Sequence, residues 1–595
     1  MRRRALATAV AAWVLLAVVA PRAFAHAQLK STSPARGAVL AVQPKTVAFR
    51  FDESVEGKFG AIKVFDAGAR RVDDGDTRHP AGEGSALATG LKPRLPEGTY
   101  TATYRVISSD GHPVEGGVVF SIGRAGSGPA KTIDQLIGSH RAGPWTRVPF
   151  GLVRTIDYLA LALALGVLGF LRWCWRLGLP RVADGGSAWL EASEAVATRG
   201  RRVLLLTVCA GISSALLGLV FEGATAAGTT FWDALHPTIL RDLLSTRFGT
   251  VWGLKGLVWL VLGALLVPRG PLRALVVPPA ARGGSGAFSR LRPLAFVPPA
   301  GALAVAPALA GHARTSGNTL LLVPSDVLHV VAMSVWLGGL AALLLLVPRA
   351  TARLVPADRT SLLAAVLVRF SPLALACVLT LMVSGTVQSV LYLTSFGDLL
   401  HDAFGRAVLI KIVLIIALAG LGAINRQKVL PKLRHLAADG SAPGSSGHLL
   451  RRTLRAEVTV VMAVLITTGA LVGYAPPSST AGTGSGPQNI SKRIGPAQLE
   501  VTTEPARVGP NTMHVYLFDA RSGAPYTATK QLTLTARQRG RGIGPIPITL
   551  EPTGPGHYTA QSFQLVPGGT WTFALTDRVS DFDQYATTFT VKVTS

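Results

Sequence analysis

The sequence is poor in charge and almost free of sulfur. Only 15% of its 595 residues are charged and 49% are hydrophobic, whereas soluble domains are about 25% charged. This composition excludes a soluble multidomain protein and predicts several membrane spans. Three cysteines and five methionines exclude a disulfide framework, a cysteine-based zinc or iron–sulfur centre and a large methionine-rich copper(I) site. Histidine, present 12 times, is the remaining soft metal ligand.

Acidic residues are also scarce relative to basic ones, which leaves a net charge of +27. Such an excess can indicate a nucleic-acid or anionic-lipid partner. Membrane proteins, however, concentrate Lys and Arg in their cytoplasmic loops. The position of the charge along the chain therefore decides between the two interpretations.

The first 25 residues have the pattern of a secretory signal peptide. A basic Met1–Arg4 start is followed by an apolar stretch and by Ala23-Phe24-Ala25, a typical cleavage sequence. Cleavage after Ala25 makes His26 the first residue of the mature protein. The overlapping Ala25-His26-Ala27 leaves the exact cut open.

Eight apolar runs in the rest of the chain are long enough to cross a bilayer, which takes about 20 residues in a helix. They predict a bundle of eight transmembrane helices. The runs lie near residues 150–171, 203–226, 249–267, 294–311, 326–347, 370–392, 407–424 and 456–475.

The basic residues alternate between the loops of this bundle. The four loops expected inside carry 6, 5, 4 and 7 Lys and Arg, 22 in all, against four in the three loops expected outside. This positive-inside pattern predicts a protein of the plasma membrane with both chain flanks outside the cytoplasm. It also explains most of the net charge without a nucleic-acid partner, so we expect none.

Two β-rich flanks surround the bundle, because short runs of β-branched and aromatic residues alternate there with Gly and Pro turns. We therefore expect two small β-sandwiches, an extracytoplasmic one at each end of the membrane domain. The expected divisions are a signal peptide at 1–25, a domain at 26–123, a linker at 124–149, the membrane domain at 150–475, a linker at 476–490 and a domain at 491–595.

Three residues of the first flank form a candidate copper site. A free amino terminus at His26 offers its α-amine and its ring nitrogen to one metal, and His112 adds a third nitrogen. The carboxylate of Asp110 can supply an oxygen. Tetragonal nitrogen and oxygen sites favour Cu(II), and the amine must lose its proton to bind.

The first flank resembles the periplasmic copper-binding protein CopC over residues 26–123. The likeness rests on His26, on Ser33-Pro34 and on the segment from Ser109 to Gly116, which contains Asp110-Gly111-His112-Pro113. It implies a Greek-key β-sandwich and a Cu(II) site made by His26, Asp110 and His112. No methionine lies between residues 26 and 123, so the methionine-rich Cu(I) site of some CopC proteins is not implied.

Polar residues inside membrane spans are costly and are therefore functional candidates. Asp326 and His329 share one helix face at the start of the fifth span. His312 ends the fourth span on the same predicted outer side, so the three form a candidate entrance for a metal ion. In the first span, Arg154 and Asp157 have the same three-residue spacing and are expected to pair with each other.

The membrane region resembles the CopD copper resistance family over residues 150–475. The likeness implies an eight-helix membrane protein that works together with CopC. The matching features are Asp326, His329, Trp336–Leu340, Arg369–Ser371, Ser384-Gly385, Phe404–Arg406, Lys411 and Asn425-Arg426.

Together these features predict a fused CopC–CopD protein that binds external Cu(II) and imports it across the lipid bilayer. A protein that holds or senses copper without transporting it is the alternative. An enzyme is not expected, although copper mono-oxygenases also use an amino-terminal histidine. Met513, His514 and His557 of the last domain do not cluster in the sequence, and we expect that domain to contact an external copper chaperone or another protein.

Overall fold

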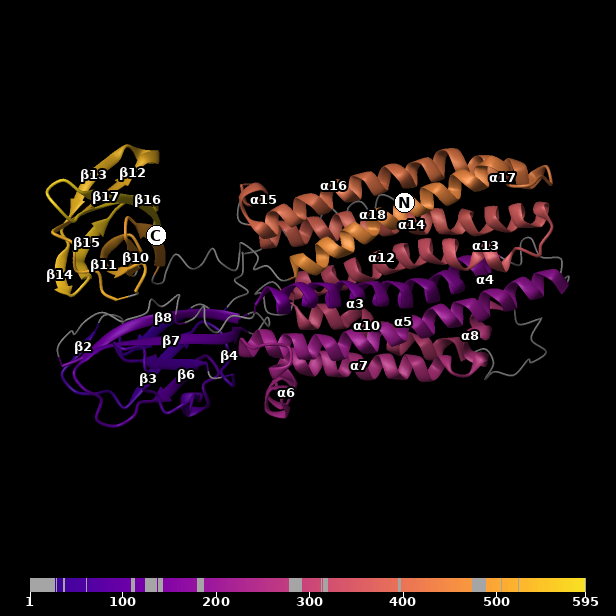
Figure 1. Ribbon diagram of the computed structural model, residues 1–595. Coiled ribbons are helices and arrows are strands. Elements are labelled where there is room, and N and C mark those ends of the chain that lie inside the picture. Colours follow the sequence, from indigo (N-terminus) through magenta and orange to yellow (C-terminus); the bar gives the residue numbers. More distant parts are fainter. Residues whose placement is uncertain are drawn as a thin grey trace. The chain divides into compact units, whose positions relative to one another are not determined.

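The computed structural model describes residues 27–593 apart from short gaps. The residues left out are 1–26, 28, 36–37, 60, 109–112, 124–135, 137–142, 179–186, 278–291, 312, 314–318, 394–396, 473–487, 505, 523 and 594–595. Figure 1 shows two β-domains and one set of long helices.

The N-terminal domain is a β-sandwich. One sheet has the order β1-β3-β6, and the second has β2-β8-β7-β4 with β5 also paired to β7. Side chains alternate along β3, so that Val47, Phe49 and Phe51 enter the core. The strands are β1 Leu29–Ser33, β2 Val39–Leu40, β3 Thr46–Phe51, β4 Val55–Glu56, β5 Ile62–Phe65, β6 Ala86–Gly90, β7 Gly98–Ser108 and β8 Pro113–Ile122.

The C-terminal domain has a five-stranded sheet, β14-β15-β11-β10-β9, and a four-stranded sheet, β13-β12-β16-β17. Trp571 and Phe573 are fully buried in its core. Its first strand begins at Gln488, three residues inside the expected linker. The strands are β9 Gln488–Ile494, β10 Ala497–Glu504, β11 Gly509–Asp519, β12 Gln531–Gln538, β13 Ile543–Ile548, β14 Glu551–Gly554, β15 His557–Leu565, β16 Gly569–Arg578 and β17 Gln584–Val593.

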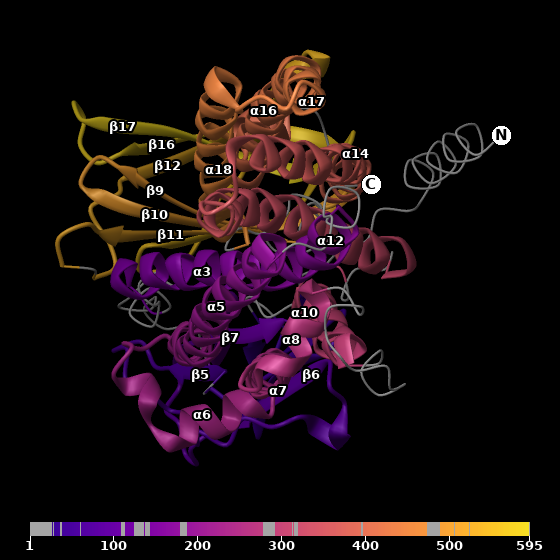
Figure 2. The ribbon, with the colours of Figure 1, turned by 90° about the vertical axis from the view of Figure 1, so that its right-hand side faces the viewer.

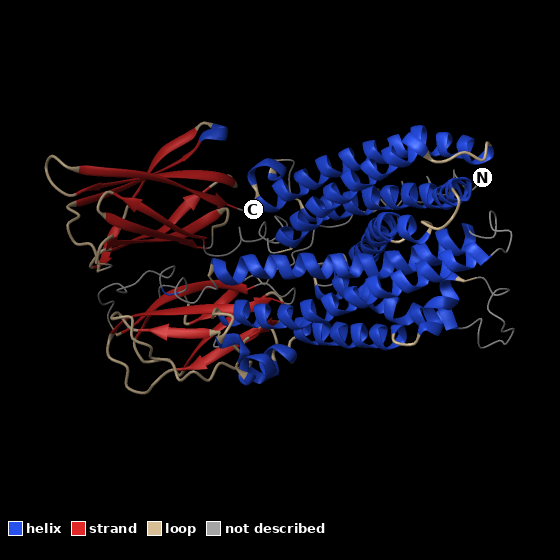
Figure 3. Ribbon diagram, turned by 45° about the vertical axis from the view of Figure 1, so that its right-hand side comes forward, coloured by secondary structure: helices blue, strands red, loops and turns tan. Residues whose placement is uncertain are grey.

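Within the described residues, eight helices are long and apolar enough to cross a membrane, which confirms the predicted number. Figure 3 shows them in blue as one bundle. The corresponding α-helices are α3 Pro144–Phe170, α5 Ser187–Ala227, α7 Arg247–Leu266, α10 Val297–Ala310, α12 Thr319–Leu345, α14 Pro356–Tyr392, α16 Ala403–Ile424 and α18 Gly444–Leu471.

Several helices are longer than the apolar runs that predicted them. Helix α5 has 41 residues and is therefore about 60 Å long, twice the thickness of the hydrocarbon core. Its first turns carry charged residues, including Arg199 and Arg201. Hydropathy marks only the part of a helix that lies in lipid. The prediction from hydropathy therefore assigned the charged N-terminal turns of α5 to a loop.

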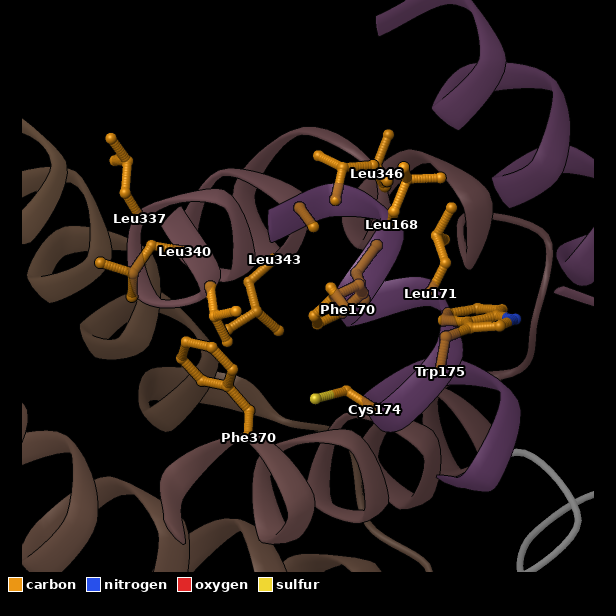
Figure 4. Close-up of a cluster of buried hydrophobic side chains, with 14 of the residues drawn as sticks. Leu168, Phe170, Leu171, Cys174, Trp175, Leu337, Leu340, Leu343, Leu346 and Phe370 are labelled. Carbon is orange, nitrogen blue, oxygen red and sulfur yellow. The ribbon is translucent and has the colours of Figure 1, made fainter. Parts of the chain in front are cut away.

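Helix α12 lies in the middle of the bundle, where it packs against α3, α14, α10 and α18; Figure 2 shows α3 and α12 next to each other in a second view. Figure 4 shows the core around Phe170, Trp175, Leu340 and Phe370, in which side chains of α12 face those of α3 and α14.

Small residues make the closest of these contacts. A side chain at Gly166 of α3 would collide with the backbone of Gly338 in α12. Without side chains the two backbones approach closely, as in other membrane helix pairs.

Candidate functional site

Four of the six predicted site residues, His26, Asp110, His112 and His312, lie outside the described residues. The residues that border the first three are described. Strand β7 ends at Ser108 and β8 begins at Pro113, so Asp110 and His112 belong to the connection of this antiparallel hairpin. Buried Ala27 donates its backbone N–H to the hydroxyl of Ser108 over 3.3 Å. The residue that follows His26 therefore contacts the residue that ends β7.

A carboxylate that the sequence did not single out lies at the same place. The hydroxyl of Ser108 donates a hydrogen bond to Glu53, which is partly buried just before β4. Strand β4 pairs with the end of β7 at Val55 and Ser108. Sequence reasoning missed Glu53 because residues 53 and 108 meet only through the register of this sheet.

In the membrane domain, Asp326 and His329 lie one turn apart on α12, as predicted. The Nδ1 atom of His329 lies 2.9 Å from the Oγ of Ser384 on α14. Ser384 donates its own proton to the carbonyl of Thr380 over 2.7 Å, so its oxygen accepts from Nδ1–H. This pattern leaves the lone pair on Nε2 of His329, the form in which imidazole binds a metal.

Groups from two other helices interact with this pair. Lys411 of α16 interacts electrostatically with both Asp326 and His329, and Asp326 in turn acts on Tyr158 of α3. In the part of the chain that the structure describes, Asp326 makes no hydrogen bond and no ion pair.

These groups also lie at one depth. Asp326, Ser384 and Lys411 are each about eight residues from the end of their helix on the same side of the bundle, or about 12 Å along the axis. Among the described residues, no three His, Cys, Asp or Glu side chains form a group that could hold a metal.

The expected pairing of Arg154 with Asp157 is wrong. Asp157 instead pairs with Lys255 of α7 and accepts a hydrogen bond from Ser214 of α5 over 3.2 Å, while Arg154 lies 3.7 Å from Glu222 of α5. Residues spaced by three share a face, but that face packs against α5 and α7 here, and these helices supply opposite charges. The network fixes α3, α5 and α7 together through buried, compensated charges.

A cavity of about 270 Å³ opens between the other halves of α12, α14, α16 and α18. Trp336 and Ser371 line it together with Asn425, Arg426 and Glu457. Glu457 accepts a hydrogen bond from the side-chain amide of Asn425 over 2.7 Å. Among these four helices, polar groups therefore occur at two depths, one near His329 and one at the cavity.

Three known protein families match separate segments of the chain. Residues 29–123 match the CopC domain, residues 146–321 the copper resistance protein D-like N-terminal domain, and residues 364–471 copper resistance protein D. The N-terminal β-sandwich is thus a CopC domain, and the chain is a multi-pass membrane protein.

Individual relatives agree with the family matches. The chain is 29% identical to the copper transport protein CutJ of Bacillus subtilis over 97% of its own length and 98% of that protein. It is 30% identical to copper resistance protein C of Escherichia coli over 18% of this chain and 86% of that one. The crystal structure of CopC from Methylosinus trichosporium OB3b aligns with a TM-score of 0.16 and 34% identity, covering 16% of this chain and 93% of that chain. The protein belongs to the CopC and CopD family of copper transport and resistance proteins.

Proposed function

We propose that this protein imports copper: the N-terminal domain captures Cu(II) outside the plasma membrane, and the bundle carries it inward. The observation that carries the proposal is the pair on α12, in which an imidazole with a free Nε2 and a carboxylate without a hydrogen bond or ion pair among the described residues lie inside a membrane span. Polar residues at that depth are costly, and those that occur inside membrane spans often mark an ion path.

In this proposal the capture site consists of the α-amine and ring of His26, the imidazole of His112 and the carboxylate of Asp110. The hydrogen bond between Ala27 and Ser108 supports it, because it joins the two chain segments that carry these ligands. Glu53, hydrogen-bonded to Ser108, would add negative charge beside the captured cation. Three nitrogens and one oxygen suit tetragonal Cu(II).

From the capture site, copper would pass to the entrance formed by His312, Asp326 and His329. Asp326 would attract the cation and His329 would bind it through Nε2, while Lys411 repels it and shortens its stay. The ion would then reach the cavity beside Glu457, whose carboxylate lies on the inner side in the proposed topology.

The experiment measures copper in two cell fractions. Cells producing the wild type, His329→Ala or the control His435→Ala, an exposed residue of α17 (Leu430–Ala438), are washed with a membrane-impermeant chelator before the cytosol is assayed. We expect the wild type and the control to raise cytosolic copper and His329→Ala not to do so. A rise confined to chelator-removable copper would support the alternative, a protein that sequesters copper without transport.

A further inference from the structure

Two histidines of the C-terminal domain, 43 residues apart in the sequence, come together in the five-stranded sheet. His514 lies on β11 and His557 on β15, which pair antiparallel with Tyr516 opposite His557; Figure 1 shows the two strands side by side. Met513 and Val515 enter the core, so His514 between them faces the opposite side of the sheet. The spacing of His514 and His557 in the sequence therefore does not indicate that they are neighbours in the fold.

Three donor atoms converge on one point of that face. The Nδ1 of His514 lies 3.2 Å from the Nε2 of His557, and the Oγ1 of Thr559 lies 3.3 Å and 3.4 Å from these nitrogens. A triangle with these edges has a centre about 1.9 Å from each corner, close to the metal–nitrogen distance of about 2.0 Å. An ion just above the triangle would thus have three neighbours at bonding distance and one open position.

The neighbours of His557 hold its ring in place. Its Nδ1 lies 3.1 Å from the hydroxyl of Thr553, and its ring stacks on Tyr516 with 4.1 Å between the centroids. A hydrogen bond at the far nitrogen is the usual way in which a metal-binding imidazole is oriented.

We propose that His514 Nδ1 and His557 Nε2 bind a copper ion, with the hydroxyl of Thr559 on the third side. Imidazole nitrogens suit copper, and divalent copper binds such ligands more tightly than the other first-row metals. The site would give the chain a second copper-binding domain at its other end. It is independent of the proposed import, because binding is measured without transport.

The first test counts copper on full-length protein in detergent. The parent carries His112→Ala to weaken the proposed N-terminal site, and it is compared with the added pair His514→Gln and His557→Gln and with the control pair His236→Gln and His435→Gln, both exposed in the structure. After loading with Cu(II) and desalting, we expect the parent and the control to hold one more copper per chain than the His514 and His557 variant. Equal copper contents of the parent and the His514 and His557 variant would overturn the proposal. The two imidazoles would then only form a hydrogen bond with each other.

A second measurement needs no variant at these positions and so does not depend on their folding. Hydrogen–deuterium exchange of the same parent is followed with and without Cu(II). We expect copper to slow exchange in β11 and β15, Gly509–Asp519 and His557–Leu565, and not in β12 and β13. Unchanged exchange in β11 and β15 at excess copper would contradict the site. Failure of cellular copper import would not affect either readout.

Discussion

The hydroxyl of Ser384 accepts a hydrogen bond from His329, with 2.9 Å between Oγ and Nδ1, and this bond joins α14 to α12 at the depth of Asp326. Because Ser384 also donates to Thr380, it sets the ring nitrogen that carries the proton. In the proposed copper path, a change at Ser384 would therefore act on copper through His329 and not by direct contact.

Ser384→Ala removes the hydrogen bond that orients His329. It should raise the copper concentration for half-maximal uptake about tenfold, which is the smaller end of the loss in metal affinity usually seen when a metal ligand loses its hydrogen-bond partner. Maximal uptake should fall less. Thr386→Val on the same helix is the matched control, since its hydroxyl only bonds to Met382 one turn earlier. Equal effects of both substitutions would show that Ser384 supports the helix and not the histidine.

The proposed capture site depends on a free amino group at His26. One alanine inserted between the signal peptide and His26 should weaken Cu(II) binding strongly, because the α-amine is then displaced from the ring, and His112→Ala should do the same. Electron paramagnetic resonance of the purified protein should show a nitrogen-rich tetragonal signal that both changes reduce. The variants carry His514→Gln so that the C-terminal domain does not contribute. Unchanged spectra and affinities would refute the amino-terminal ligand set.

The buried pair of Asp157 and Lys255 should be sensitive to the loss of one partner. Asp157→Asn leaves a charged lysine without compensation and should cost about 3–5 kcal/mol of unfolding free energy, while the double change Asp157→Leu and Lys255→Met should cost far less. Unfolding in detergent measures this difference. Glu191→Gln, which breaks the exposed pair with Arg353, serves as the control and should cost under about 1 kcal/mol. A double variant as unstable as Asp157→Asn would contradict the argument.

The stability of the N-terminal domain should depend on acid through Asp73. Burial alone disfavours its charged form, but hydrogen bonds from Arg71 and from the backbone of Val64 outweigh burial and lower the pKa of Asp73. Its stabilising effect is therefore present above the unfolded pKa of about 3.9 and is lost as the pH falls through the lower folded value.

Asp73→Asn should accordingly destabilise the domain at pH 7 and lose its effect once the pH falls below the lowered pKa of Asp73, because the wild-type carboxyl is then protonated as well. Hydrogen–deuterium exchange of β5 and β7 in the full chain, compared at the two pH values, measures the difference. If wild type and variant differ in exchange protection by the same amount at both pH values, the charge of Asp73 is not the cause of the difference in stability.

The fold was predictable where it depends on properties of single segments. Eight spans follow from hydropathy, and the strand runs around Phe49 and Phe573 follow from alternation. The shared face of Asp326 and His329 was predictable for the same reason, since a spacing of three residues fixes neighbours on one helix.

Contacts between segments were not predictable in this way. The partners of Arg154 and Asp157 come from α5 and α7, and no spacing within α3 reports them. The approach of His514 to His557 depends on the register of β11 and β15, which is set by the whole sheet. Glu53 was missed because its link to Ser108 arises from the pairing of β4 with β7.

Copper entry into sealed proteoliposomes tests the central claim most directly. Purified full-length protein is reconstituted around a copper-sensitive dye, and Cu(II) is added outside. The wild type and His435→Ala should bring copper to the lumen faster than protein-free vesicles, and His329→Ala should reduce the rate to that of the empty vesicles. A wild type no faster than empty vesicles, or a His329→Ala variant as fast as the wild type, would contradict transport through this site.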